Sequence, residues 1–208
     1  MTMDISACNR IDGTVTFIKK GKATTDLRMS SPVGEIALVL TSSGVEELAL
    51  AEGDAVTALF REIDVMLMTG DGAISTKNRF PARVTGEIKK GNVTAELALD
   101  LGGGRRIVAV VARGAAEEMG LVPGSEVVAC VREGDLLLAK AGRLSVRNSS
   151  PGTITNLRPG TVTTEITVDT PGGTVQALLA RSVADDMRLA VGDRVKALLR
   201  ERDYLLAR

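Results

Sequence analysis

The alternation of apolar and polar positions is clearest in the middle of the chain. Residues 93–100 alternate almost strictly, which is the pattern of a half-buried β-strand. A stretch beginning at Val84 precedes them and ends in the turn signal of residues 89–92, Lys-Lys-Gly-Asn. A glycine-rich turn at residues 101–104 leads into the largely apolar segment 106–112. We therefore predict three consecutive strands joined by two tight turns.

A short helix and two further strands complete this unit. Residues 115–119 have a helix-forming composition but are too few for an independent helix, and Pro123 and Gly124 end the segment. Two apolar stretches follow, at residues 126–131 and 136–140. Five short strands with a helix between the third and fourth form the order of an OB-like barrel. Closure of such a barrel would hide sheet edges that otherwise promote association.

The same unit is written three times. Strand-like segments recur at residues 23–29, 35–40, 55–60 and 65–68 and again at 162–169, 174–180, 194–199 and 204–207, with helices at 45–48 and 183–187. The landmarks keep their register: a Ser-x-x-Asn opening (Ser6, Ser75, Ser145), a later glycine (Gly53, Gly124, Gly192), and an aspartate (Asp64, Asp135, Asp203). This repetition indicates duplication of a whole domain. We predict three tandem all-β domains with short helices, at residues 1–70, 71–141 and 142–208. The joining segments are short, so neighbouring domains should touch.

Composition removes several classes of function. The 26 basic residues balance the 26 acidic residues, and aromatic residues make up 2% of the chain, so a basic groove with stacking aromatics is not evident. Histidine is absent, which removes the commonest general acid/base and transition-metal ligand. Cys8 and Cys130 fit no Cys-x-x-Cys pattern, and we predict buried thiols and no metal-cation site. No catalytic set or cofactor motif is present, so we expect a protein that is not an enzyme.

The hydrophobic runs are too short for a membrane helix. The longest span about six residues, for example residues 107–112, whereas a crossing needs about twenty. The first residues show no basic segment followed by an apolar core, as a secretory signal would. We therefore expect a soluble, cytoplasmic protein without membrane or nucleic-acid partners.

Several short motifs together resemble a known family. They are the opening Ser-x-(Arg/Lys)-Asn, the segment Ile88–Glu96, the glycine pair after it, the Glu-Glu-(Leu/Met) helix and the Gly-(Asp/Ser) turn. This set resembles the Mop domain of the molbindins, also called TOBE-like, in three tandem copies covering nearly the whole chain. The resemblance implies cytoplasmic binding of molybdate or tungstate, at sites between domains, in closed assemblies that usually contain six domains.

The chemistry of the ligand agrees with this composition. Molybdate is a tetrahedral dianion whose oxygens only accept hydrogen bonds, so its site needs converging N–H, O–H and cationic donors. The resemblance implies that one class of site uses Ser6, Asn9, Ser75, Lys77, Asn78, Ser145, Arg147, Asn148, Arg61, Arg132 and Arg200. A second class at backbone turns would involve Lys20, Gly21, Lys90, Gly91 and Gly160. Among the opening motifs we expect Arg147 to contribute most, since its guanidinium offers several donors in a fixed fork.

Each motif also has a plainer interpretation. The Ser-x-x-Asn openings fit the start of a strand, and the Lys-Lys-Gly segments fit hairpin turns with solvated lysines. Residues 101–104 favour a hairpin connection over a phosphate loop, because no Gly-Lys-Ser/Thr follows them.

The chain departs from the family pattern at three places. The first opening motif has Cys8 where the family has arginine. The fourth strands end in Arg-Glu pairs, at residues 61–62, 132–133 and 200–201, and a carboxylate beside a dianion repels it. Either these glutamates point to water, pairing with a neighbouring arginine, or this class of site is lost. The third turn has Pro159, which carries no N–H.

The leading hypothesis is non-catalytic storage or buffering of molybdate or tungstate, without a covalent cofactor. The alternatives are a structural or sensory module of the same fold that has lost part of its sites, and a nucleic-acid-binding OB protein. Six domains divided by three per chain favour a homodimer, with a trimer as the alternative.

Overall fold

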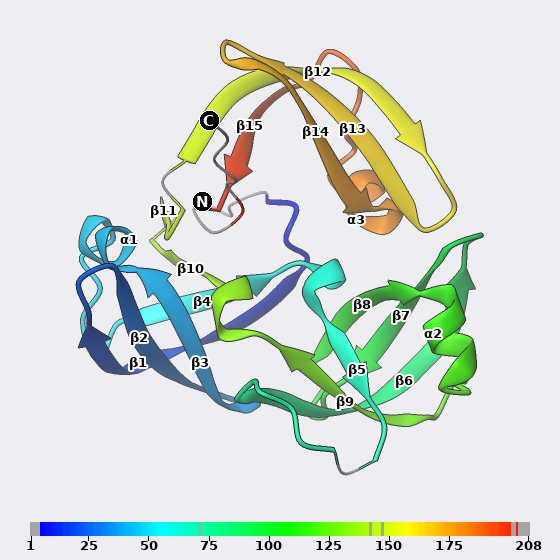
Figure 1. Ribbon diagram of the computed structural model, residues 1–208, viewed down its shortest axis with the longest axis horizontal. Helices are drawn as coiled ribbons and strands as arrows, with labels where there is room; N and C mark the ends of the chain where they lie inside the picture. Colours follow the sequence, from blue (N-terminus) through cyan, green and yellow to red (C-terminus); the bar gives the residue numbers. More distant parts are fainter. Residues whose placement is uncertain (1–4, 71, 142, 147, 201–202, 204–208) are drawn as a thin grey trace, which may run out of the picture.

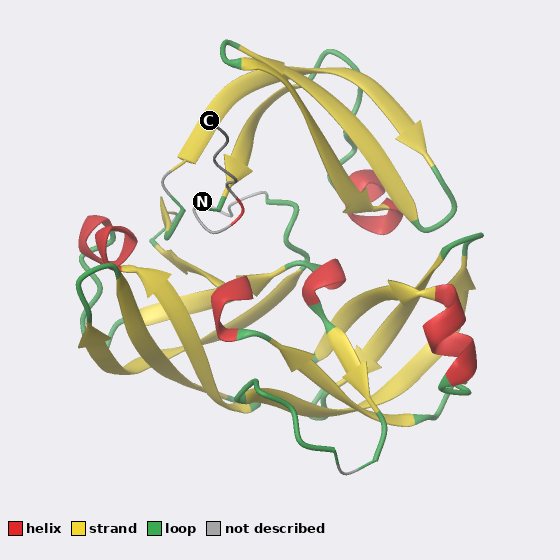
Figure 2. Cartoon of the chain, in the orientation of Figure 1, coloured by secondary structure: helices red, strands yellow, loops and turns green. Residues whose placement is uncertain are grey.

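The computed structural model describes residues 5–70, 72–141, 143–146, 148–200 and 203. The chain forms three small antiparallel sheets with a short helix beside each (Figures 1 and 2). In the view of Figure 1 the first and second sheets lie side by side and the third lies above them. The predicted all-β architecture of three OB-like domains with short helices is confirmed, with one correction to the strand pairing.

The three domains repeat the same order of elements. The first contains β1 (Asn9–Lys20), β2 (Thr24–Ser31), β3 (Gly34–Thr41), α1 (Ser42–Glu47), β4 (Ala55–Phe60), the 3-10 helix η1 (Glu62–Asp64) and β5 (Met66–Met68). The second contains β6 (Asn78–Lys90), β7 (Thr94–Asp100), β8 (Arg106–Ala112), α2 (Arg113–Glu118), β9 (Glu126–Val131), η2 (Glu133–Asp135) and β10 (Leu137–Lys140). The third contains β12 (Asn148–Pro159), β13 (Thr163–Thr170), β14 (Gly173–Ala180), α3 (Arg181–Asp186) and β15 (Arg194–Leu199), after the short β11 (Arg143–Leu144).

The long first strand of the second domain starts earlier than the apolar pattern suggested. We expected a strand from Val84, but β6 begins at Asn78 because residues 78–83 pair with β9. The Ser-x-x-Asn motif therefore stands at the start of the strand in every copy. The glycine-rich segment 101–104 joins β7 to β8, which confirms the expected hairpin connection.

The landmark glycines have a conformational reason. Gly53, Gly124 and Gly192 adopt φ values of 90°, 93° and 97° in the turn before the fourth strand. This region is open to glycine and strained for other residues. The repeated glycine therefore marks the same turn in all three domains.

The fifth strands of the first two domains are exchanged, which corrects the expectation that each barrel completes itself. β5 follows the first domain but pairs with β9 of the second, with Met66 opposite Cys130. β10 follows the second domain but pairs with β4 of the first, with Leu137 opposite Leu59. The exchange crosses the proposed boundary at residue 70. For the third domain, the segment 204–207 predicted as its fifth strand lies outside the described residues.

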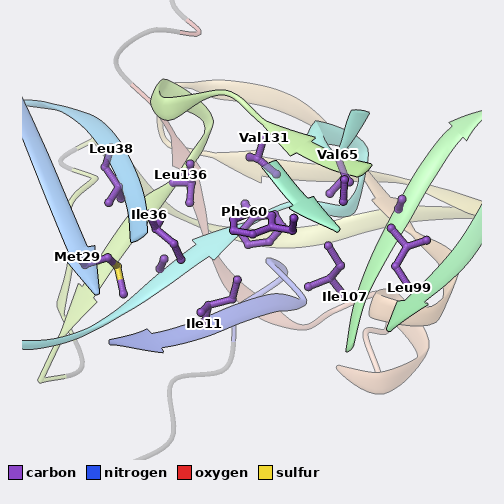
Figure 3. Packing of buried hydrophobic residues seen from close by; sticks show 14 of the residues in the cluster. Ile11, Met29, Ile36, Leu38, Phe60, Val65, Leu99, Ile107, Val131 and Leu136 are labelled. Carbon is purple, nitrogen blue, oxygen red and sulfur yellow. The ribbon is translucent and has the colours of Figure 1, made fainter. Parts of the chain in front are cut away.

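The exchange gives the first two domains one hydrophobic core. Buried residues from both belong to a single cluster. Figure 3 shows Phe60 and Ile36 of the first domain close to Val131 and Ile107 of the second. Val65, just before β5, lies on the side of Ile107. Because these apolar side chains are shielded by both sheets, neither domain would keep its core dry alone.

Candidate functional site

The opening asparagines of the first two domains clamp the two domains together. Asn78 Nδ2 donates to the Ala37 carbonyl at 2.8 Å, and the Ala37 N–H donates to Asn78 Oδ1 at 2.8 Å. Asn9 makes the reciprocal pair with Val108, at 2.9 and 2.7 Å. Both amides thus act as an added peptide group at the edge of the neighbouring domain's third strand. Their hydrogen-bonding capacity toward a ligand is largely used.

The other residues of the opening motifs lie in three different settings. Ser145 is buried, and its hydroxyl accepts from the Leu138 N–H at 3.0 Å. Ser6 is half-buried, while Ser75 and the Lys77 side chain are exposed. Arg147, expected to be the strongest contact of these motifs, lies outside the described residues.

The Glu62 carboxylate accepts hydrogen bonds at the junction of the first and third domains. Glu62 is 1% exposed, and its Oε1 accepts from the Ala180 N–H at 2.8 Å. Its Oε2 accepts from the Cys8 thiol at 3.4 Å. In the second domain, Glu133 Oε1 similarly accepts from the Lys77 N–H at 2.7 Å. The two glutamates thus occupy donors of the opening motifs.

The surroundings of the Cys8 thiol change its pKa. Burial, followed by the charge of Glu62 and the hydrogen bond to it, raises the pKa of Cys8 far above its ordinary value. Desolvation disfavours the thiolate, and the adjacent carboxylate repels it. Cys8 therefore remains a protonated donor. Cys130 is a free, buried thiol, as expected, whereas the free thiol of Cys8 is half-buried.

The three arginines predicted as site residues form ion pairs with aspartates and not with the glutamates that follow them in the chain. Arg61 bonds Asp64 at 2.8 and 2.9 Å, Arg132 bonds Asp135 at 2.8 Å, and Arg200 bonds Asp203 at 2.7 Å. The suggestion that each glutamate pairs with its neighbouring arginine is therefore wrong for Glu62 and Glu133, and Glu201 lies outside the described residues. The spacing explains the choice, because the turn of η1 or η2 brings the residue three positions on back to the arginine.

Arg200 joins all three domains at their centre. Its Nη1 lies 3.2 Å from Asp64 Oδ2 of the first domain and 3.2 Å from the Asp135 carbonyl of the second. The Arg200 side chain is 11% exposed, so this junction is poorly solvated. Sequence reasoning recorded the three aspartates only as landmarks; the repeated Arg-x-x-Asp spacing was the signal that could have indicated their role.

The glycine turns of the second and third domains are brought together. A Cβ placed on Gly91 would lie 3.1 Å from Val162, in the turn that follows Gly160. In Figure 1 the tips of the β6–β7 and β12–β13 hairpins approach each other, while the β1–β2 tip lies at the opposite side. The turn containing Lys20 and Gly21 is thus separated from the other two. The hairpin interpretation of the Lys-Lys-Gly segments is confirmed for both the first and second domains.

The lysines of these turns differ in their partners. Lys89 binds Glu96 at 2.9 Å, and this hydrogen bond raises the pKa of Lys89. Ser182 of the third domain donates to the other oxygen of Glu96 at 2.8 Å. Lys90 lies 4.0 Å from Glu117. In the first domain, Lys20 makes no ion pair with any described residue, and its charge is available to an anion.

Within the described part of the chain, no group of three or more His, Cys, Asp or Glu side chains could hold a metal ion. The search of the same residues for a helix long and apolar enough to cross a membrane found none.

Comparisons with known proteins agree with the repeat. The family model of the TOBE domain matches residues 5–67, 74–137 and 144–200. The molybdenum-pterin-binding protein MopB of Rhodobacter capsulatus is 35% identical over 137 residues, covering 64% of this chain and 50% of that protein. The molybdenum-pterin-binding protein 2 of Clostridium pasteurianum is 36% identical over 66 residues, covering 32% of this chain and 96% of that protein. The chain therefore spans about half the length of MopB.

One solved structure matches about two thirds of the chain. The cytoplasmic molybdate-binding protein ModG, in a form with molybdate bound, superposes with a TM-score of 0.63 and 33% sequence identity. The match covers 66% of this chain and 99% of ModG.

Proposed function

Since the chain belongs to the TOBE domain family, with three copies of the domain, we propose that it binds molybdate or tungstate as an oxyanion. The observation that carries this proposal is the similarity to ModG, whose structure holds molybdate, at 33% identity over 66% of this chain. We further propose that the role is cytoplasmic storage or buffering of the anion and that no reaction is catalysed.

The geometry supports binding at seams between domains. Donors from separate domains converge there on negatively charged groups, as the Ala180 N–H and the Cys8 thiol do on Glu62. Such a preformed set of donors suits an acceptor-only dianion. Among the predicted turn positions, Gly91 lies against Val162 in the turn that follows Gly160, and Lys90 precedes Gly91 in the chain. We propose this pair of turns as part of one oxyanion site.

The opening-motif class of site is proposed to be reduced in number. Glu62 and Glu133 occupy donors of the first and second motifs. The exposed Ser75 and Lys77 side chains and the half-buried Ser6 remain as contacts for the anion. Arg200 would act there mainly by its positive field, because aspartates engage its Nε, Nη1 and Nη2, whereas Arg61 and the exposed Arg132 keep guanidinium donors that no described aspartate takes.

Isothermal titration calorimetry with molybdate, tungstate and sulfate tests the proposal. We expect saturable binding of the first two anions and weaker binding of sulfate. Lys90→Ala should lower the affinity, because it removes a cation beside the paired turns. Lys196→Ala, on β15, is the matched control and should leave the affinity unchanged. Absence of heat and of retained anion in equilibrium dialysis would contradict a binding role.

One observation favours a second function, a structural module that has kept the fold and lost some sites. The buried Glu62 places a fixed negative charge among the donors of the seam. If dialysis retains neither molybdate nor tungstate while the domains stay assembled, this alternative replaces storage. In both cases we propose that the chain associates with itself, with a homodimer favoured over a trimer.

A further inference from the structure

Three sulfur-bearing side chains share one small face of the second sheet. β5 pairs with β9 in a register that sets Met66 directly opposite Cys130. Residues opposite each other in antiparallel strands lie on the same face, with Cβ atoms about 4.5–5.5 Å apart. Met68 follows two residues later on β5, so its side chain points to this face as well. The exchange of β5 thus brings two thioethers and one thiol together.

This face is turned away from the shared core. Leu67, between the two methionines, packs against the core, and Ala129, beside Cys130, belongs to it. Side chains alternate along a strand, so Met66, Met68 and Cys130 point to the opposite side of the sheet. Cys130 is nevertheless 0% exposed, whereas both methionines are half-buried. The thiol is therefore covered, and the thioethers are the part of the cluster that solvent reaches.

The equivalent face of the first domain shows that this packing does not require sulfur. There β10 pairs with β4, and the corresponding positions hold Leu59, Leu137 and Ala139. Leu59 is 2% exposed, so a hydrocarbon side chain fills its place as completely as the thiol does in the second domain. Methionine can fill irregular gaps, but leucine does so here without it. The sulfur atoms add one property that leucine and alanine lack, which is the ability to bind a soft cation.

The surroundings favour a cation of low charge. Arg79 lies opposite Cys130 on the other side of β9. Its guanidinium is held by the carbonyl oxygens of Thr76 and Ile74, at 3.1 and 2.7 Å. Burial raises the pKa of the Cys130 thiol, while the charge of Arg79 acts in the opposite direction and favours the thiolate. A monovalent cation with one thiolate forms a neutral pair, whereas a divalent cation would keep a positive charge that Arg79 repels.

We propose that Met66, Met68 and Cys130 bind one Cu(I) ion. Thiolate and thioether ligands select Cu(I), whereas Mg²⁺ and Ca²⁺ prefer oxygen ligands and Zn²⁺ prefers several thiolates or imidazoles. On binding, the Cys130 thiol releases its proton to water and its sulfur donates an electron pair to the ion. The thioethers donate without losing a proton, and the copper keeps its oxidation state.

The copper site is independent of the oxyanion proposal, because it uses none of the residues assigned to molybdate. The spacing of cysteine and histidine along the chain had indicated no metal-cation site. Methionine was not considered there, and β5 reaches Cys130 only through the exchange of strands. The half-buried thioethers provide an entry path to the covered thiol, since methionine side chains are flexible.

Competition between the reduced full chain and the chromogenic Cu(I) chelator bathocuproine disulfonate, without oxygen, tests the proposal. We expect one Cu(I) per chain and no comparable binding of Zn²⁺. The double variant Met66→Leu with Met68→Leu removes both thioethers at nearly constant volume. It should raise the dissociation constant at least about tenfold, the loss that removing even an outer-shell partner of a metal ligand causes. Met119→Leu is the matched control, because Met119 is partly buried against the shared core, and it should leave the affinity unchanged.

X-ray absorption at the copper edge identifies the ligands. We expect three sulfur neighbours in the wild type, and nitrogen or oxygen neighbours in their place would overturn the proposal. Cys130→Ser should lose the ion; retention at the wild-type affinity would assign the copper to Cys8, which all variants keep. Circular dichroism checks folding, and the double methionine variant decides if Cys130→Ser does not fold.

Two further results would reject the copper site. The first is a wild-type chain that yields all its copper to the chelator, and the second is a double methionine variant with unchanged affinity. A chain that binds Cu(I) but no molybdate keeps this site and rejects the proposed function. A chain that binds molybdate but no Cu(I) does the reverse.

Discussion

Replacing Glu62 by alanine should destabilise the junction between the first and third domains. The carboxylate is 1% exposed and accepts from Ala180 N–H and from the Cys8 thiol. Its loss leaves the Ala180 N–H without an acceptor in a buried place, at a cost of about 1–3 kcal/mol. The truncation also leaves a small cavity, while relief of the carboxylate's desolvation offsets part of the loss. We expect a net decrease of about 2 kcal/mol in the free energy of unfolding.

Urea denaturation followed by circular dichroism measures this change. Glu62→Gln retains an oxygen for the Ala180 N–H and should lose about 1 kcal/mol or less. Glu87→Ala removes an exposed glutamate of β6 that makes no ion pair with any described residue, and its effect should stay within about 0.5 kcal/mol. The expected order of the three variants in free energy of unfolding follows from the hydrogen bond to Ala180, because the loss of a negative charge alone would affect Glu62→Ala and Glu87→Ala equally.

Molybdate should act differently on the alanine variant and on the wild type. In the wild type the Glu62 carboxylate occupies the donors of this seam, and its charge repels a dianion. The alanine variant frees these donors, so saturating molybdate should stabilise it more. A site filled at a hundred times its dissociation constant adds about 2.7 kcal/mol. Thermal denaturation with and without molybdate, with chloride at equal ionic strength as the control, measures the difference.

Two results would refute this reasoning. If Glu62→Ala is as stable as Glu87→Ala, the buried bond to the Ala180 N–H contributes nothing to the junction. If molybdate raises the denaturation temperature of Glu62→Ala no more than that of the wild type, the donors around Glu62 do not bind an oxyanion when the carboxylate is removed. The first outcome bears on packing and the second on function, so each can be decided separately.

Three further predictions follow from the described contacts. Asn78→Ala should lower the free energy of unfolding by about 2–4 kcal/mol in urea denaturation, since the N–H and the carbonyl of Ala37 would both lose their partner; an effect below 1 kcal/mol would show that the clamp is not formed. Arg200→Leu should cost about 1–3 kcal/mol in the same assay, because the buried Asp64 and Asp135 would each lose one of their two arginine partners and the Asp135 carbonyl would lose its donor; a variant as stable as the wild type would contradict the central junction. Burial raises the pKa of both Cys8 and Cys130, so the native thiols should stay protonated at pH 8 and react with a disulfide reagent far more slowly than in urea; equal rates in the two states would contradict the burial.

The sequence was a good guide to the repeated elements. Period-two alternation of apolar residues and the turn glycines depend on local geometry, and the copies at Gly53, Gly124 and Gly192 required the same positive φ. The helices were found near their observed places, although α1, α2 and α3 start two to three residues earlier than their composition indicated. Hairpin connections such as residues 101–104 were also predictable, because the turn and its flanking strands are neighbours in the chain.

The partners of the polar motifs could not be read in the same way. Asn78 was an expected ligand contact, but its amide fits the backbone of Ala37, a position 41 residues away in another domain. Glu62 was expected either to face water or to abolish a site, and its acceptor role depends on Ala180, 118 residues away. Such contacts depend on how whole domains pack, and the local pattern of apolar and polar residues contains no information on that packing.

By itself, the sequence determined three similar all-β units, their short turns and a set of donors suited to an oxyanion. The tertiary structure decided which unit completes which: β5 and β10 change places, the asparagines become clamps, and the third domain keeps the same surfaces exposed. The physical reason is that alternation records that one face of a strand will be buried, while it contains no information on the chain that buries it. Three similar copies offer several such partners, and the asparagine clamps and the shared core around Phe60 and Val131 hold the first domain on the second.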